Sequence, residues 1–194
     1  MTMQMLPPAD TAMLLIDHQD GTMSWVSSID QQVMKANAIA LARAAKALDM
    51  PLVLTSSLED HAQGPFAKEF EEFVPDEVAA RIKRTGVVNA WDDPAFAAAV
   101  AATGRRILII VGVTNDVCTV YPTLSALALG YTVHVVADAG GSTNKIADDA
   151  ALRQMERAGA VITSTNMILT GLAGNWNSPA GQAVLPAVAS LIPN

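Results

Sequence analysis

Short aliphatic runs alternate along the chain with segments whose apolar residues recur at helical spacing. The runs are continuous rather than alternating with polar residues, which is typical of strands buried on both faces of a sheet. Strands are predicted at 11–17, 51–55, 78–84, 107–111, 131–138 and 160–163. Helices are predicted at 30–49, 66–73, 93–103, 120–128 and 145–158. Because strand and helix alternate, we expect a three-layer α/β/α, Rossmann-like fold with a central six-stranded, mostly parallel sheet.

Two of the predicted helices begin after capping residues. Asp30 and Asp93 can accept hydrogen bonds from the first free backbone N–H groups, and Pro94 suits a first helical turn. In the helix at 30–49, one face consists mainly of small residues and is expected to pack closely on the sheet. That face is Val33, Ala36, Ala40, Ala44 and Ala47.

The 194 residues contain no internal repeat, low-complexity tract or linker, so a single domain over 1–194 is expected. The tail at 165–194 stays rich in apolar residues, such as Met167 and Trp176, after the sixth strand has completed the sheet. Large exposed apolar patches are uncommon on monomers. We therefore predict a homo-oligomer in which this tail takes part in a subunit contact.

Charge and residue usage exclude several classes of function. The formal charge of −7 argues against nucleic-acid binding, which needs clustered lysines and arginines. A single cysteine excludes a disulfide framework, and neither glycine-rich nucleotide-binding motif is present. No secretory signal pattern opens the chain, and no stretch approaches the roughly 20 apolar residues of a membrane span. A soluble cytoplasmic protein with a small-molecule substrate is the expectation.

The most informative stretch runs from 107 to 130, where an aliphatic strand, a tight turn and a helix start follow one another. Cys118 lies at that helix start, where the helix dipole favours a thiolate. The free backbone N–H groups of the first turn can also bind a developing oxyanion. The alternative is that Cys118 is a small buried apolar residue at a strand–helix junction.

Three polar features follow predicted strands: Asp17, the loop at 56–61, and Cys118. In parallel sheets, ligands bind at the carboxyl ends of strands, near the point where the strand order reverses. If the first and fourth strands are neighbours, Asp17 and Cys118 share a crevice and pair a base with a nucleophile. The alternative for Asp17 is a capping or turn residue.

Four segments resemble the isochorismatase-like cysteine hydrolases, and most closely the YcaC-like branch of that superfamily. Within them, GVTNDVC around the cysteine is the most specific motif, whereas LLIDHQ alone is a weak one. The resemblance spans residues from about 12 to 160 and thins beyond Ser164. The segments are Leu14–Gly21, Leu54–Pro65, Ile82–Phe96 and Ile109–Gly141.

The resemblance implies an Asp–Lys–Cys triad, in which Asp17 matches the aspartate and Cys118 the nucleophile. The cation position falls on Lys83 or Arg84, which are adjacent, so on a strand only one of them can face the site. The YcaC-like branch resembles this chain in having an arginine seven residues before the tryptophan that Trp91 matches, and that arginine is Arg84 here. Arg84 is therefore the preferred cation, with Lys83 as the alternative.

The resemblance also implies a cis peptide bond just before Thr114 and an oxyanion hole made by the backbone N–H groups of Thr114 and Cys118. The helix start and the neighbouring cation predict a pKa of the Cys118 thiol below its free value of about 8.5. Apolar and aromatic residues that follow the strands and the cysteine are expected to wall a small-molecule pocket. They are Met23, Trp25, Trp91 and Tyr121.

Metal binding is the other chemistry that the family offers. The nicotinamidase branch holds a divalent ion through an Asp-x-His pair and further histidines, but the loop at 56–61 reads SSLEDH and lacks that pair. His18 and His61 could meet in the crevice, whereas His134 lies inside a predicted buried strand. Because metal sites normally need three or four ligands, no metal and no cofactor are predicted.

The predicted function is a cysteine-dependent hydrolase that cleaves a small amide, or a related C–N or ester bond, through a thioester-type intermediate. The alternative is a catalytically silent oligomeric binding or scaffold protein that retains the fold. A thiol-based redox sensor is disfavoured because the chain has no resolving cysteine. The resemblance further implies a tetramer or an octamer.

Overall fold

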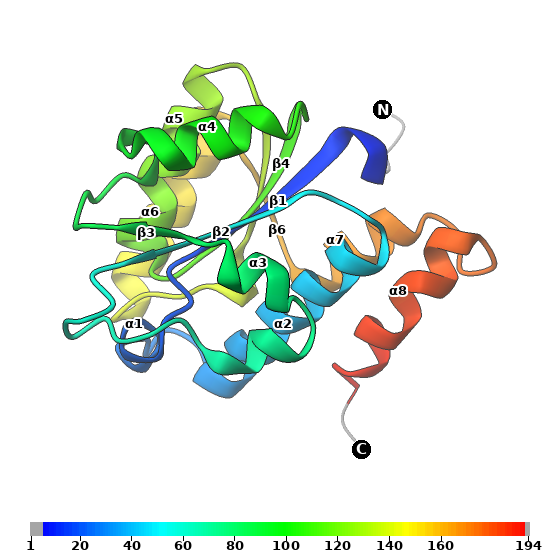
Figure 1. The fold of residues 1–194 in the computed structure, drawn as a ribbon, viewed down its shortest axis with the longest axis horizontal. Helices are drawn as coiled ribbons and strands as arrows, with labels where there is room; N and C mark the ends of the chain where they lie inside the picture. The colour runs from blue at the N-terminus through cyan, green and yellow to red at the C-terminus, as the bar shows by residue number, and fades with distance from the viewer. Residues whose placement is uncertain (1–5, 193–194) are drawn as a thin grey trace.

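A computed structural model describes residues 6–192. Six strands form one sheet in which every neighbouring pair is parallel, in the order β3-β2-β1-β4-β5-β6 (Figure 1). The expected three-layer α/β fold is confirmed, and the sheet is wholly rather than mostly parallel. The strands are β1 (Thr11–Ile16), β2 (Leu52–Ser57), β3 (Ile82–Arg84), β4 (Ile107–Gly112), β5 (Thr132–Val136) and β6 (Val161–Thr163).

The strand order reverses next to β1. The chain moves from β1 outward to β2 and β3, and then returns to place β4 on the other side of β1. Leu14 on β1 lies in register with Val53 on one side and with Ile110 on the other. The carboxyl ends of β1 and β4 are therefore neighbours, at the position where parallel sheets hold their ligands.

Helices cover both faces of the sheet (Figure 1). Alternate residues of β1 point to opposite faces, so Met13 and Leu15 pack in one apolar cluster whereas Leu14 and Ile16 pack in the other. The first cluster lies under α2 (Gln31–Ala47), α3 (Pro75–Ala79), α7 (Thr165–Ala173) and α8 (Pro179–Ala189). The second lies under α4 (Pro94–Ala102), α5 (Val120–Ala128) and α6 (Lys145–Ala158).

Local signals explain most of the helix boundaries. Asp30 accepts hydrogen bonds from two backbone N–H groups at the start of α2, and Asp93 does the same at the start of α4. The helix predicted at 66–73 is a shorter 3-10 helix, η2 (Lys68–Glu72), and the predicted strand at 78–84 is reduced to β3. The reason is α3, an unpredicted helix that begins at Pro75, where proline suits the first turn.

The face of α2 that meets the sheet differs from the predicted one. Ala40 and Ala44 are buried as expected, but Val33, Ala36 and Ala47 are exposed. The larger apolar side chains Met34 and Leu41 are fully buried instead. Their burial removes more apolar area from water than burial of alanines would, and this turns the helix by about one residue position.

The tail packs on its own subunit. Helices α7 and α8 contact each other and α2, and their residues Leu169, Leu172 and Val184 are buried in the first apolar cluster. Met167 and Trp176 remain 60% and 41% exposed. The tail therefore completes the core and also presents apolar side chains outward. Within residues 6–192, no helix has the length and apolar character that crossing a membrane requires.

Candidate active site

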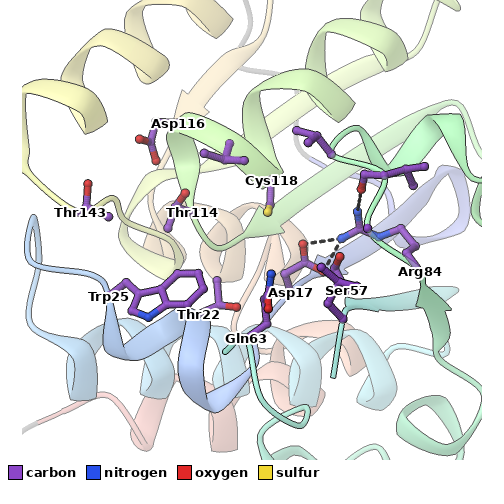
Figure 2. Close-up of a pocket in the computed structure, with 15 residues that line it drawn as sticks. Asp17, Thr22, Trp25, Ser57, Gln63, Arg84, Thr114, Asp116, Cys118 and Thr143 are labelled. Atoms are coloured by element: carbon purple, nitrogen blue, oxygen red, sulfur yellow. Dashed lines mark hydrogen bonds and ion pairs between the residues drawn. The ribbon is translucent and has the colours of Figure 1, made fainter. Parts of the chain in front are cut away.

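Asp17, Arg84 and Cys118 meet at the carboxyl ends of β1, β3 and β4, where they line one cavity of about 210 Å³ (Figure 2). The Cys118 sulfur points toward the Asp17 carboxylate, and Arg84 approaches that carboxylate from the other side. The strand-end reasoning therefore brought together the acid and the thiol that the sequence singled out.

Cys118 is positioned by the turn that follows β4. The Val113–Thr114 peptide bond is cis, and residues Asn115–Thr119 form a single π-helical turn before α5 begins. Cys118 thus lies in a wide turn ahead of the α-helix rather than in its first turn. The Thr114 backbone N–H lies near the Cys118 sulfur and favours its thiolate form.

A buried polar network fixes this turn. The Asn115 backbone N–H donates to the Gly141 carbonyl at 2.8 Å, and the Asn115 side chain donates to Asp148 Oδ1 at 3.0 Å. Ser142 Oγ donates to the same carboxylate oxygen at 2.9 Å. Gly112 allows the close return of the chain, because a Cβ there would lie 2.5 Å from Thr119 Oγ1. The loop after β5 and the start of α6 therefore hold the cysteine turn in place.

Asp17 follows β1 directly and has φ of 59°, which is uncommon for a residue other than glycine. Its backbone N–H donates to the Thr55 carbonyl at 2.9 Å, so the residue stays tied to β2. Both carboxylate oxygens accept from Nη2 of Arg84. The side chains of Asp17 and Arg84 are only 2% and 1% exposed.

Arg84, not Lys83, faces Asp17. Nε of Arg84 donates to Thr55 Oγ1 at 3.0 Å, and Nη1 donates to the Val87 carbonyl at 2.7 Å. The Lys83 side chain is 60% exposed and pairs with Glu59 at 2.9 Å on the other face of β3. The arrangement thus selects the preferred alternative of the two adjacent cations.

Burial dominates the ionisation of the pair. It raises the pKa of the Asp17 carboxyl, and the Arg84 guanidinium offsets part of that rise. Burial, and then the negative charge of Asp17, raise the pKa of the Cys118 thiol well above its ordinary value. The prediction of a lowered thiol pKa is therefore wrong, because burial outweighs the cation and the nearby backbone N–H. The resting thiol is therefore neutral, and it lies beside the Asp17 carboxyl group that Arg84 contacts.

The pocket walls agree only partly with the prediction. Trp25 lines the cavity, whereas Met23 is buried in the first apolar cluster. Trp91 packs on Phe96 and Tyr131 away from the site. Tyr121 is 46% exposed, and it also lies outside the lining of this cavity. The expectation for Met23, Trp91 and Tyr121 is thus wrong for the cavity of the single chain.

Sequence reasoning missed most of the lining residues. They come from loops after β1, β2, β3, β4 and β5, so the rule that located Asp17 and Cys118 also points to their loops, but not to individual side chains. The missed residues are Thr22, Ser57, Leu58, Gln63, Gly86, Val87, Val88, Asp116, Val117 and Thr143.

The histidines do not gather at the site. The His18 ring is buried, and its Nε2 lies 3.0 Å from the Ala139 carbonyl oxygen, to which it donates. Burial lowers the pKa of His18 to about 4. His61 is exposed on the loop after β2. Across residues 6–192, no three His, Cys, Asp or Glu side chains lie close enough together to hold a metal ion.

Comparisons with known proteins agree with the fold. The isochorismatase domain model matches residues 11–167. Probable hydrolase YcaC of Escherichia coli strain K12 is 40% identical over 177 residues, which are 91% of this chain and 84% of the relative.

Two solved structures are similar over nearly the whole chain. The E. coli YcaC gene product, an octameric hydrolase of unknown specificity, has a TM-score of 0.91 at 38% identity and covers 100% of this chain and 93% of its own. YcaC from Pseudomonas aeruginosa, solved with hexane-2,5-diol and covalent acrylamide, has a TM-score of 0.88 at 40% identity. The match covers 98% of this chain and 96% of that one. These matches confirm the resemblance found in the four sequence segments. The chain belongs to the isochorismatase family of hydrolases.

Proposed function

We propose that this chain is a cysteine hydrolase that cleaves a small amide, or a related C–N or ester bond, through a thioester intermediate. The observation that carries the proposal is the contact between the Cys118 thiol and the Asp17 carboxylate. Arg84 forms an ion pair with the same carboxylate from its other side. A nucleophile, a base and a fixed cation in one cavity are the parts that acyl transfer needs.

The first half of the reaction forms the acyl-enzyme. Asp17 accepts the thiol proton while Cys118 Sγ bonds to the substrate carbonyl carbon, whose π electrons move to oxygen. The backbone N–H groups of Thr114 and Cys118 donate to that oxyanion. When the carbonyl reforms, the C–N bond breaks, and the leaving nitrogen takes the proton from Asp17.

The second half releases the acid. Asp17 accepts a proton from water, whose oxygen bonds to the thioester carbon. Collapse of that intermediate breaks the C–S bond, and the proton on Asp17 returns to sulfur. Arg84 keeps its own proton throughout, so it serves as a positioning charge and not as an acid. The raised pKa of Asp17 suits this role, since a stronger base accepts the thiol proton more readily.

The relatives support a reactive centre and an assembly. The P. aeruginosa YcaC structure contains covalent acrylamide, an electrophilic amide, and the E. coli YcaC is octameric. We extend the assembly to this chain as a proposal, in which a homo-oligomer uses the outward apolar residues of the 165–194 tail. Their exposure on an otherwise packed tail is the supporting observation.

A panel of small aliphatic and aromatic amides, assayed by ammonia release, tests the hydrolase. We expect at least one amide to be turned over, and Cys118→Ala to abolish that turnover. Intact-mass analysis after acid quench should show an acyl adduct on the wild type and none on Cys118→Ala. Hydrolysis that persists in Cys118→Ala would overturn the mechanism. No turnover and no adduct across the panel would favour the silent binding protein.

A further inference from the structure

The cavity beside Cys118 contains three charged residues, and two of them neutralise each other. Asp17 and Arg84 form a buried ion pair. All three guanidinium nitrogens of Arg84 already donate to protein oxygens, on Thr55, Val87 and Asp17. With its side chain 1% exposed, Arg84 has no free face to offer to a substrate anion.

Asp116 is the third charged residue, and its charge is not compensated. It lines the cavity two residues before Cys118, and Figure 2 places it above Thr114, on the side of the cavity away from Arg84. Its Oδ1 is shielded from solvent and accepts no hydrogen bond from the residues between 6 and 192. No cation in that part of the chain forms a salt bridge with it. The cavity therefore carries a net negative charge near the nucleophile.

Most of the remaining wall is apolar, and its other side chains, on Thr22, Ser57, Gln63 and Thr143, are polar but uncharged. Trp25, Leu58, Val87, Val88 and Val117 surround the space, and at about 210 Å³ it is only moderately larger than a cavity of about 150 Å³ that admits benzene. Such walls suit a compact hydrocarbon group of roughly ring size. The described lining holds no cation besides Arg84, which is paired with Asp17, and burying a carboxylate without a cationic partner is costly.

We infer that this site selects small amides with a compact apolar acyl group that is uncharged or bears an amine, and rejects those with a carboxylate, because of Asp116. That the substrate is an amide rests on the proposed function. The charge selection rests only on the cavity. Asp116 acts here as a specificity residue, since it lines the cavity and takes no part in bond breaking.

Alkylation of the single cysteine tests the charge selection without requiring turnover. Iodoacetamide and iodoacetate are close in shape and differ in charge. We expect the ratio of their rates with Cys118, measured by intact mass at one pH, to exceed the ratio with N-acetylcysteine by about tenfold or more. The degree of thiol ionisation cancels in this ratio, so the raised pKa of Cys118 does not affect it.

Asp116→Asn isolates the residue. Asp17 and Arg84 stay paired in both proteins, so the ratio should fall several-fold toward that of N-acetylcysteine only if Asp116 repels the anion. Glu156→Gln, which removes one exposed charge on α6, is the matched control for net charge and should leave the ratio unchanged. A wild-type ratio equal to that of N-acetylcysteine, or one that Asp116→Asn leaves unchanged, would overturn the inference.

Matched substrates link the selection to catalysis. Hexanamide and 6-aminohexanamide should be hydrolysed with kcat/KM at least tenfold above that of the monoamide of adipic acid, and Asp116→Asn should narrow the gap. If no amide is turned over while the alkylation ratio behaves as expected, the hydrolase proposal fails and the charge selection stands. If amides are turned over at rates that do not depend on their charge, the hydrolase proposal stands and the charge selection fails.

Discussion

Arg84 and Asp17 lie 67 residues apart in the sequence and form an ion pair in which neither side chain exposes more than 2% of its surface. The pair joins the ends of β3 and β1, on the same side of the sheet as the cysteine turn. Arginine stays protonated at any accessible pH, so the pair remains ionic unless the carboxyl itself takes a proton. Asp17 can therefore accept the thiol proton without losing its position.

The two adjacent cations should respond differently to removal. Arg84→Ala leaves the Asp17 carboxylate buried and unpaired, so we expect a loss of about 3–5 kcal/mol of unfolding free energy and loss of hydrolysis. Lys83→Ala breaks only a pair with an exposed lysine, which is worth about 1 kcal/mol or less. Urea unfolding of both variants measures the difference. A Lys83 variant that is the more damaged of the two would contradict the assignment of the cation.

Ionisation of the thiol should separate from catalysis in Asp17→Asn. The Asp17 charge raises the pKa of Cys118, so an uncharged amide at that position should lower it and leave Arg84 to favour the thiolate. The inflection in the rate of iodoacetamide alkylation against pH should therefore move to lower pH, while hydrolysis falls by orders of magnitude because the base is gone. An inflection that stays in place or moves upward would show that Asp17 does not act on the thiol.

Much of the site followed from the sequence because it depends on strand ends. Continuous aliphatic strands predicted a parallel sheet, and the carboxyl-end rule then placed Asp17 and Cys118 together. The resemblance reduced the cation to Lys83 or Arg84, and alternation along β3 required that only one of them face the site. The ion pair between Arg84 and Asp17 shows which one does.

Other features could not be predicted because they depend on packing between distant segments. The thiol pKa was predicted in the wrong direction, since burial of Cys118 depends on loops that the sequence does not place. Trp91 was assigned to the pocket from its position after β3, yet it packs on Phe96 and Tyr131. Asp116 stood within the most specific motif, but its missing partner is visible only once the surrounding loops are in place.

His18 should make the fold sensitive to acid. Its pKa in the folded chain is about 4 against an ordinary 6.5, so the unfolded chain binds a proton in this interval and the folded chain does not. The stabilising effect of neutral His18 is full above pH 6.5 and is lost as the pH falls toward 4, by up to about 3 kcal/mol.

Chemical unfolding at pH 7 and pH 4.5 measures this effect. His18→Gln keeps an N–H for the Ala139 carbonyl and removes the titration, so it should lose less stability on acidification than the wild type. Both proteins contain Asp17, whose raised pKa favours the folded state on acidification because a protonated carboxyl is favoured in the fold. Its contribution to stability therefore cancels when the two proteins are compared. His61→Gln, on the exposed loop, serves as the control and should respond to acid as the wild type does. Equal acid sensitivity of His18→Gln and the wild type would rule out His18 as the cause.

Assembly should depend on the outward residues of the tail and not on the tail as a whole. Removing residues after Ser164 would expose the surface of α2 that Leu169, Leu172 and Val184 cover, so a truncated chain would report on folding rather than on subunit contact. Met167→Lys is the sharper change, since this side chain is 60% exposed on α7 and its replacement leaves the covered surface intact.

We expect light scattering to show a homo-oligomer for the wild type and a smaller species for Met167→Lys. Ile146→Lys, at an 81% exposed apolar position on α6 over the other face of the sheet, is the matched control and should keep the wild-type mass. A monomeric wild type at micromolar concentration would refute the assembly, whereas an unchanged mass for Met167→Lys would place the subunit contact elsewhere, because a buried lysine at a closed apolar interface would cost several kcal/mol per copy.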